Sequence, residues 1–321
     1  MAARTIGLLS LAWVALGTLL SAQMVTLERI AIVPMAADLV RASGSHAYVA
    51  AGRTLTIVDI RDPSMPKTRG SVALDEPVYG LAVADSKGYV ANGLRGFAAL
   101  DLSNLDAPKV IGALKTPGEA VRIALTGSRA LVANRMSGVQ VIDVSTPQTP
   151  VALGSYYTEG YTRDVAAAGP FAYIVDSTRD FAVVDVSKRG EPRSLSTQEL
   201  TGQTALVAVR GSGLSTEPPN VYVLGGGVLQ VFDLTSPSTP KKVTSFKISE
   251  RSQAIAVDGT IAYVAAGSDG LQIVDLSNPE APIGAGSYTK SGAVRDVAVS
   301  GELVLVAAVS PPGVHILRKT R

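Results

Sequence analysis

The chain of 321 residues contains no cysteine, one tryptophan and two histidines. Without cysteine, thiol catalysis, disulfide cross-links and zinc sites with cysteine ligands are excluded. The two histidines, His46 and His315, fall in no recognisable catalytic pattern. We therefore expect no catalytic residue, no metal and no cofactor, and the sequence favours a protein that is not an enzyme.

Charged residues are also scarce, at 17% of the chain, and the formal net charge is only +2. The basic residues are scattered singly, whereas nucleic-acid binders usually concentrate them in a patch or stripe. We expect no nucleic-acid partner. Apolar residues reach 46%, so the chain has enough of them for one large domain with a buried core.

Only one long apolar run is present, from Ile6 to Leu20, with Arg4 before it and Ser21-Ala22 after it. A positive start, an apolar stretch and small residues are typical of a secretory signal peptide. We expect residues 1–22 to be removed and residues 23–321 to form the exported domain, which would be periplasmic, extracellular or attached to the cell surface. A retained membrane anchor is the alternative, although the run is shorter than the roughly 20 residues that a spanning helix needs.

The dominant feature of the remaining sequence is a repeat of apolar residues followed by Asp, another apolar residue, Ser or Thr, and then proline. Its six aspartates lie 42, 42, 42, 48 and 42 residues apart: Asp59, Asp101, Asp143, Asp185, Asp233 and Asp275. A degenerate seventh copy has Arg318 in the Asp position. A period near 42 built of short apolar strands indicates an array of sheets closed into a ring.

One unit shows how the strands follow each other. Residues 163–167, 171–175 and 181–186 are apolar, β-branched or aromatic stretches separated by Gly-Pro and Asp-rich turns, and a fourth stretch follows Pro192. This punctuation every 8–12 residues is the all-β signature. Four strands in each of seven units predict an all-β fold, a seven-bladed β-propeller.

The two ends of the repeat array predict how the ring closes. Residues 25–33 form a strand with no first three strands before it, and the chain ends after a third strand at 314–317. We expect the N-terminal strand to complete the last blade, which would leave no open sheet edge.

The repeat resembles a known family. The stretch from Gly270 to Pro279, Gly-Leu-Gln-Ile-Val-Asp-Leu-Ser-Asn-Pro, and the stretch from Arg295 to Gly301 look like the LVIVD repeat of bacterial and archaeal exported and surface proteins. The resemblance covers nearly the whole chain after residue 22. It implies a propeller and an exported location, and it supplies no catalytic residues because the family has no established common activity.

The six repeated aspartates have a structural and a functional interpretation. An aspartate at a strand end can accept a hydrogen bond from the backbone N–H two residues on. Six equivalent aspartates would also lie in six separate blades instead of converging on one ligand. We therefore expect them to stabilise turns.

Residues that depart from the repeat are better candidates for function. The first strand of a propeller blade lines the central channel, so the residues at the starts of these strands should surround one channel mouth. Aligned on the repeat, Ala37-Asp38 of the first unit corresponds to Tyr79-Gly80 of the second. The candidates for ligand or partner binding are Asp38, Tyr79, Arg122, Arg163, Asp164, Gln253, Arg295 and Asp296. Two interpretations stay open: the arginines and aspartates pair and hold neighbouring blades together, or they form a polar pocket. The planar guanidinium group suits carboxylates and sugars.

A second candidate region is the insertion from Gly211 to Asn220 in the fifth unit. The insertion falls between the expected first and second strands of its blade, so it should lie on the face opposite the mouth. It is either an ordinary surface loop or a loop that contacts a partner.

The sequence therefore favours an exported, non-enzymatic propeller that acts as a rigid binding or assembly scaffold. Its expected partner is an envelope or extracellular protein, a polar small ligand or a glycan. The alternatives are a carbohydrate- or lactone-active enzyme that uses the mouth carboxylates and arginines, and a purely structural unit of a cell-surface assembly.

Overall fold

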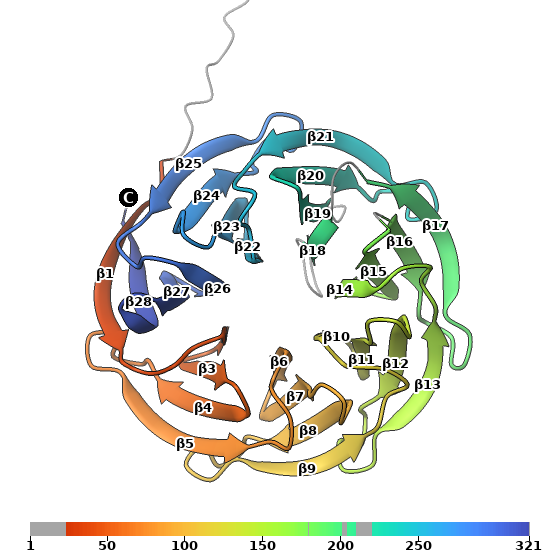
Figure 1. The fold of residues 1–321 in the computed structure, drawn as a ribbon, viewed down its shortest axis with the longest axis horizontal. Helices are drawn as coiled ribbons and strands as arrows, with labels where there is room; N and C mark the ends of the chain where they lie inside the picture. Colours follow the sequence, from red (N-terminus) through yellow and green to blue (C-terminus); the bar gives the residue numbers. More distant parts are fainter. Residues whose placement is uncertain (1–23, 179, 201–203, 210–219, 321) are drawn as a thin grey trace, which may run out of the picture.

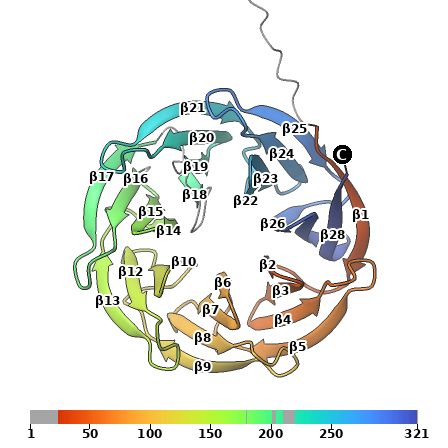
Figure 2. The same ribbon diagram turned by 180° about the vertical axis from the view of Figure 1, so that it is seen from behind.

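The strands are arranged as seven antiparallel four-stranded sheets round a central axis (Figure 1), in a computed structural model that describes residues 24–178, 180–200, 204–209 and 220–320. Figure 2 shows the same ring from behind. We number the blades one to seven in chain order from β2. The predicted seven-bladed all-β fold is confirmed. Among the described residues, no helix is long and apolar enough to span a membrane.

Within each blade the strands run from the channel to the rim. The first strands line the channel: β2 (Leu39–Ser43), β6 (Gly80–Ala84), β10 (Arg122–Thr126), β14 (Thr162–Ala168), β18 (Thr204–Val209), β22 (Ala254–Asp258) and β26 (Val294–Ser300). The second strands follow: β3 (His46–Ala51), β7 (Lys87–Ala91), β11 (Arg129–Ala133), β15 (Phe171–Asp176), β19 (Asn220–Gly225), β23 (Ile261–Ala265) and β27 (Leu303–Val309).

The third strands are β4 (Thr54–Asp59), β8 (Phe97–Asp101), β12 (Val139–Asp143), β16 (Asp180–Asp185), β20 (Val228–Asp233), β24 (Leu271–Asp275) and β28 (Pro312–Thr320). The rim strands are β5 (Lys67–Ala73), β9 (Lys109–Leu114), β13 (Val151–Tyr156), β17 (Arg193–Glu199), β21 (Lys241–Lys247), β25 (Ile283–Tyr288) and β1 (Thr26–Val33).

The second and third strands are apolar on both faces because each blade is packed between two others. In β11, for example, the four residues from Ala130 to Ala133 are all buried. The described residues form seven hydrophobic clusters, and each cluster lies between two neighbouring blades. The core is therefore a ring of seven interfaces, and every blade depends on both neighbours to bury its apolar surface.

The ring closes through β1, as predicted. β1 pairs antiparallel with β28, from Thr26 opposite Thr320 to Val33 opposite Val314, with one bulge between Arg29 and Ala31. The third strand that the sequence predicts at 314–317 is longer in the structure, where it forms β28 from Pro312 to Thr320.

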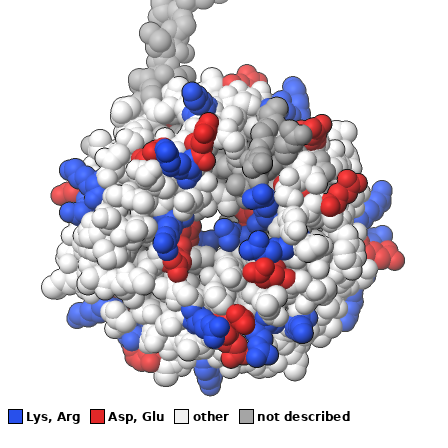
Figure 3. Space-filling model, viewed as in Figure 1, with Lys and Arg blue, Asp and Glu red and all other residues white. Residues whose placement is uncertain are grey.

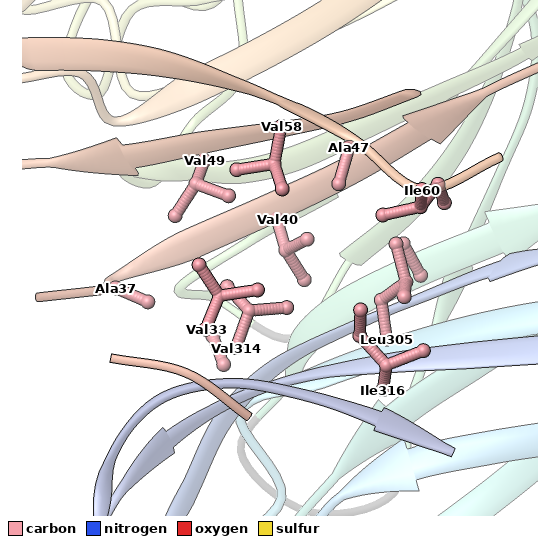
Figure 4. Packing of buried hydrophobic residues seen from close by; sticks show 12 residues of the cluster. Val33, Ala37, Val40, Ala47, Val49, Val58, Ile60, Leu305, Val314 and Ile316 are labelled. Carbon is pink, nitrogen blue, oxygen red and sulfur yellow. The ribbon is translucent and has the colours of Figure 1, made fainter. Parts of the chain in front are cut away.

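The cluster at this seam joins blades seven and one (Figure 4). Val33 and Val314 from blade seven lie beside Val40 from blade one, and Ile60 and Ile316 also belong to it. At its other end β1 reaches blade six, where the N–H of Val25 donates to the carbonyl of Ala285 at 2.9 Å. One strand thus fastens three blades.

Glycines in the rim strands make room for the next blade. A Cβ atom at Gly70 would lie 2.6 Å from the backbone of Leu105 and Asp106, and one at Gly112 would overlap the carbonyl oxygen of Pro147. In both places the loop after the third strand of the following blade packs against the rim strand. At Gly70 this contact includes a hydrogen bond from its N–H to the carbonyl of Leu105, at 2.8 Å.

The six repeated aspartates stabilise turns, as expected. In every copy an Oδ1 atom accepts a hydrogen bond from the backbone N–H two residues on, over 2.8–3.1 Å, the donors being Arg61, Ser103, Ser145, Ser187, Thr235 and Ser277. Hydrogen bonds from the residue two positions on are the main reason why the pKa of Asp101 falls to about 2 and why the pKa of Asp143 is lowered.

We expect a chain that starts at residue 34 to be much less stable than one that starts at residue 24. Removing β1 exposes the edge of β28 and opens the cluster at the seam. The measurement is thermal unfolding by circular dichroism, in which the shorter chain should lose its cooperative transition or melt far lower. Equal melting temperatures would disprove the closure.

Substituting Gly112→Ala should destabilise the protein by about 1–3 kcal/mol, the usual cost of overpacking. The new methyl group would overlap Pro147, whose backbone is held in a turn. Gly284→Ala in β25 is the matched control, because a Cβ there has no atom within 4 Å. Urea unfolding of the two variants should separate them, and equal stabilities would mean that the rim contact is loose.

Replacing Asp143 by Ala should cost about 1 kcal/mol, as for other lost turn or cap hydrogen bonds. Asp143→Asn should cost less because its side-chain oxygen can still accept from Ser145. The stability difference between wild type and Asp143→Ala should shrink as the pH falls below the ordinary carboxyl value of 3.8. Because the pKa of Asp143 is lower in the folded protein than in the unfolded chain, its carboxylate stabilises the fold above the ordinary value of 3.8. This stability is lost as the pH falls and the carboxylate is protonated. A difference that stays constant down to pH 2.5 would contradict this role.

Candidate functional site

The candidate site lies at one end of the channel, where the first strands begin. We call this the mouth face; it also carries the turns between second and third strands and the connections that lead from each rim strand to the next blade. The opposite side, with the repeated aspartate turns, is the far face. Figure 3 shows Lys and Arg side chains gathered round the central opening, with Asp and Glu beside several of them.

The structure brings the eight predicted residues together at this mouth. Seven of them line a cavity of about 300 Å³ inside the channel, the channel cavity: Asp38, Tyr79, Arg122, Asp164, Gln253, Arg295 and Asp296. The eighth, Arg163, lines an adjoining recess of about 520 Å³, to which Tyr79, Arg122 and Gln253 also contribute. We call this recess the arginine pocket.

The predicted alignment of blade one is wrong by one residue. The sequence sets Asp38 against Gly80, but the structure sets it against Tyr79, because the N–H groups of Asp38 and Tyr79 donate to the equivalent carbonyls of Ala50 and Ala91. The Gln253 N–H makes the same bond to Ala265, at 2.7 Å. Asp38, Tyr79 and Gln253 thus occupy one structural position in three blades.

Arg163 and Arg295 occupy β-bulges. The register of β14 against β15 shifts between Thr162 and Asp164, and that of β26 against β27 shifts between Val294 and Asp296. The extra residue in each bulge is therefore an arginine. Bulges commonly redirect side chains next to functional sites. The Arg163 side chain is exposed, and Arg295 forms an ion pair with Asp38.

The aspartate after each bulge fastens its blade to the next one. Asp164 accepts the N–H of Val207 in blade five at 3.0 Å, and Asp296 accepts the N–H of Val40 in blade one at 2.9 Å. Asp296 also pairs with Arg41 at 2.7 Å. These two carboxylates therefore have the structural role that the sequence left open, and Asp296 fastens the closing seam from the inside.

Asp164 has an unusual electrostatic environment. Burial raises the pKa of its carboxyl group above the ordinary value, although Arg122 and two backbone N–H groups act in the opposite direction. Its oxygens accept from Val165 at 2.9 Å and from Val207. Both oxygens are thus engaged in holding backbone.

Arg122 is partly committed to the scaffold. Its Nη1 donates to the carbonyls of Tyr79 and Val121 at 2.9 and 3.0 Å, and its Nε lies 3.9 Å from Asp164. The Arg122 side chain is 34% exposed to solvent. The guanidinium group is therefore held in place at the mouth with one side open.

The candidates chosen from the sequence leave out three residues of the site: Arg41, Arg135 and Tyr161. Arg41 lines the channel cavity, and the other two line the arginine pocket. A signal existed for Arg135, which occupies the turn position that holds Gly93 and Gly267 in blades two and six.

Two predicted features lie outside the described residues. They are the signal peptide over residues 1–22 and nearly all of the Gly211–Asn220 insertion, of which only Asn220 is described, at the start of β19. Within the described part of the chain, no group of three or more His, Cys, Asp or Glu residues is placed to hold a metal ion.

Comparison with known families decides the classification. The LVIVD repeat model matches residues 35–73, 117–158, 159–196 and 251–290, which correspond to blades one, three, four and six. The chain is an LVIVD-repeat β-propeller. A comparison with curated proteins gives no significant match to this LVIVD propeller.

Solved structures agree on the fold. The Cps50 (Swd1) β-propeller domain of Myceliophteria thermophila is similar with a TM-score of 0.75 at 11% identity, over 92% of this chain and 100% of that one. The computationally designed Ika8 protein is similar with a TM-score of 0.65 at 10% identity, over 90% of this chain and 98% of that one. At these identities the likeness concerns the fold of the LVIVD propeller alone.

Proposed function

We propose that this LVIVD propeller is an exported, non-enzymatic binding or assembly scaffold that recognises its partner at the mouth face. One observation carries the proposal: the arginine pocket is lined by Arg122, Arg135 and Arg163 but by no described carboxylate. Elsewhere at the mouth, positive and negative side chains pair. Glu119 and Asp164 approach Arg135 and Arg122 from outside the recess, while Arg163 has no ion-pair partner among the described residues. A recess lined by three guanidinium groups and only partly neutralised suits an anionic group from outside.

The stiffness of the ring supports recognition over catalysis. The mouth residues come from different blades, and each blade is packed between two neighbours, so the site is preformed. Such preorganisation lowers the cost of binding. Among the residues that the structure describes, one buried carboxyl group has a raised pKa, that of Asp164, and both of its oxygens accept backbone N–H groups. This arrangement favours a structural role over acid–base chemistry.

The test is a cross-linking pull-down from the native cell envelope, with the exported domain as bait. The variant combines Arg122→Ala, Arg163→Ala and Arg295→Ala. We expect a partner that the wild type captures and this variant does not. The control combines Lys188→Ala, Arg189→Ala and Lys241→Ala, which removes three exposed far-face cations and should leave capture intact.

Thermal unfolding must show that both variants fold, because Arg122 and Arg295 also contact the scaffold. Equal capture by wild type and mouth variant would move recognition to the rim or the far face. Loss of capture by the far-face control alone would do the same.

A further inference from the structure

We infer that the arginine pocket binds a carboxylate carried by an extended acidic segment of a partner polypeptide. This inference rests on the proposed function and adds the chemistry of the partner. Three arginines meet there from separate elements: Arg122 at the start of β10, Arg135 in the turn between β11 and β12, and Arg163 in the bulge of β14.

The positive charge of the pocket is only partly balanced by acidic neighbours. Arg135 pairs with Glu119 at 2.6 Å, and Arg122 lies 3.9 Å from Asp164, whose oxygens already accept backbone N–H groups. Arg163 has no ion-pair partner among the described residues. Its planar guanidinium fork can hold a carboxylate through two parallel hydrogen bonds. Tyr79 and Tyr161 line the same pocket.

The backbone of Arg135 gives an independent reason to assign function here. Its φ is +46°, a left-handed conformation that side chains other than glycine rarely adopt. Gly93 and Gly267 occupy the same position in other blades at +54° and +56°. The fold therefore keeps a strained arginine where glycine would serve, and such strain is typical of functional sites.

The mouth face also carries exposed apolar side chains, of which Tyr161 lines the pocket and Met136 follows Arg135 in the chain. Leu94 and Met136 lie in the turns between second and third strands of blades two and three, and Tyr157 and Tyr161 lie in the connection between β13 and β14. Between 52% and 76% of each residue is exposed. Aromatic, methionine and arginine residues are enriched at protein interfaces.

These apolar neighbours decide between two sources of a carboxylate. A small free anion would use only the arginines and would gain nothing from Met136 or Tyr157. A polypeptide can place an acidic side chain in the pocket while its adjacent apolar residues cover these exposed side chains. The combined charge and apolar surface therefore favour a peptide segment.

The experiment uses a displayed library of random 12-residue peptides selected on the immobilised exported domain. Selected peptides are then synthesised and titrated by fluorescence anisotropy, each beside a version with Asp and Glu changed to Asn and Gln. We expect acidic residues next to apolar ones in the selected sequences. We also expect binding to weaken at least tenfold in the amide versions.

Arg135→Gly is the decisive protein variant. It removes the guanidinium group and also relieves the backbone, so its melting temperature should equal or exceed that of the wild type, while peptide affinity falls at least tenfold. Arg163→Gln should weaken binding similarly. Arg53→Gln is the matched control, because Arg53 is an exposed arginine in the equivalent turn of blade one and should not affect binding.

Selected sequences without acidic residues, or equal affinity for Arg135→Gly and wild type, would overturn the inference. So would oligogalacturonate binding that depends on Arg135 with no peptide selected, since the ligand would then be a small polyanion. A pull-down partner that needs the mouth arginines, together with failure of the acidic peptides, would leave the proposed function standing and reject only this chemistry.

Discussion

Closure of the ring is the constraint on which the rest of the structure depends. No blade can bury its apolar second and third strands alone, so seven interfaces must form together. The seam between blades seven and one is held beside the channel by Asp296, which accepts the N–H of Val40, and further out by the apolar cluster that contains Val33 and Val314. Within blade seven, β1 completes the sheet by pairing with β28. The channel mouth exists only because this seam holds.

The two faces of the ring differ in how closely the blades repeat one another. The far face repeats one solution six times, an aspartate that accepts a backbone N–H two residues on. The mouth face departs from blade to blade. Tyr79 and Gln253 occupy one equivalent position, and Arg135 stands where other blades have glycine. The residues that repeat in every blade therefore make the ring rigid, and the residues that differ between blades give the mouth face its particular polar and charged side chains.

Most of the fold was readable from the sequence because the repeat is regular. The period near 42 and the turn aspartates predicted the blades, and the incomplete ends predicted β1 as the closing strand. The mouth residues were found for the same reason, since equivalent positions in a ring converge on its axis.

What the sequence could not reveal is local geometry. The bulges at Arg163 and Arg295 add a residue without changing the apolar pattern, so neither the inter-blade bonds of Asp164 and Asp296 nor the direction of the arginines could be foreseen. Arg135 was left out of the candidates although glycine occupies its position in blades two and six, because its positive φ angle is seen only in the structure.

The pairing of β1 with β28 also imposes an order in time. Thr26 and Thr320 hydrogen-bond across 294 positions of the chain. During synthesis the first strand emerges long before its partner and presents an unpaired edge, which is a hazard for association with other chains. Until the last strand arrives, the edge of the first strand stays open to pairing with other chains.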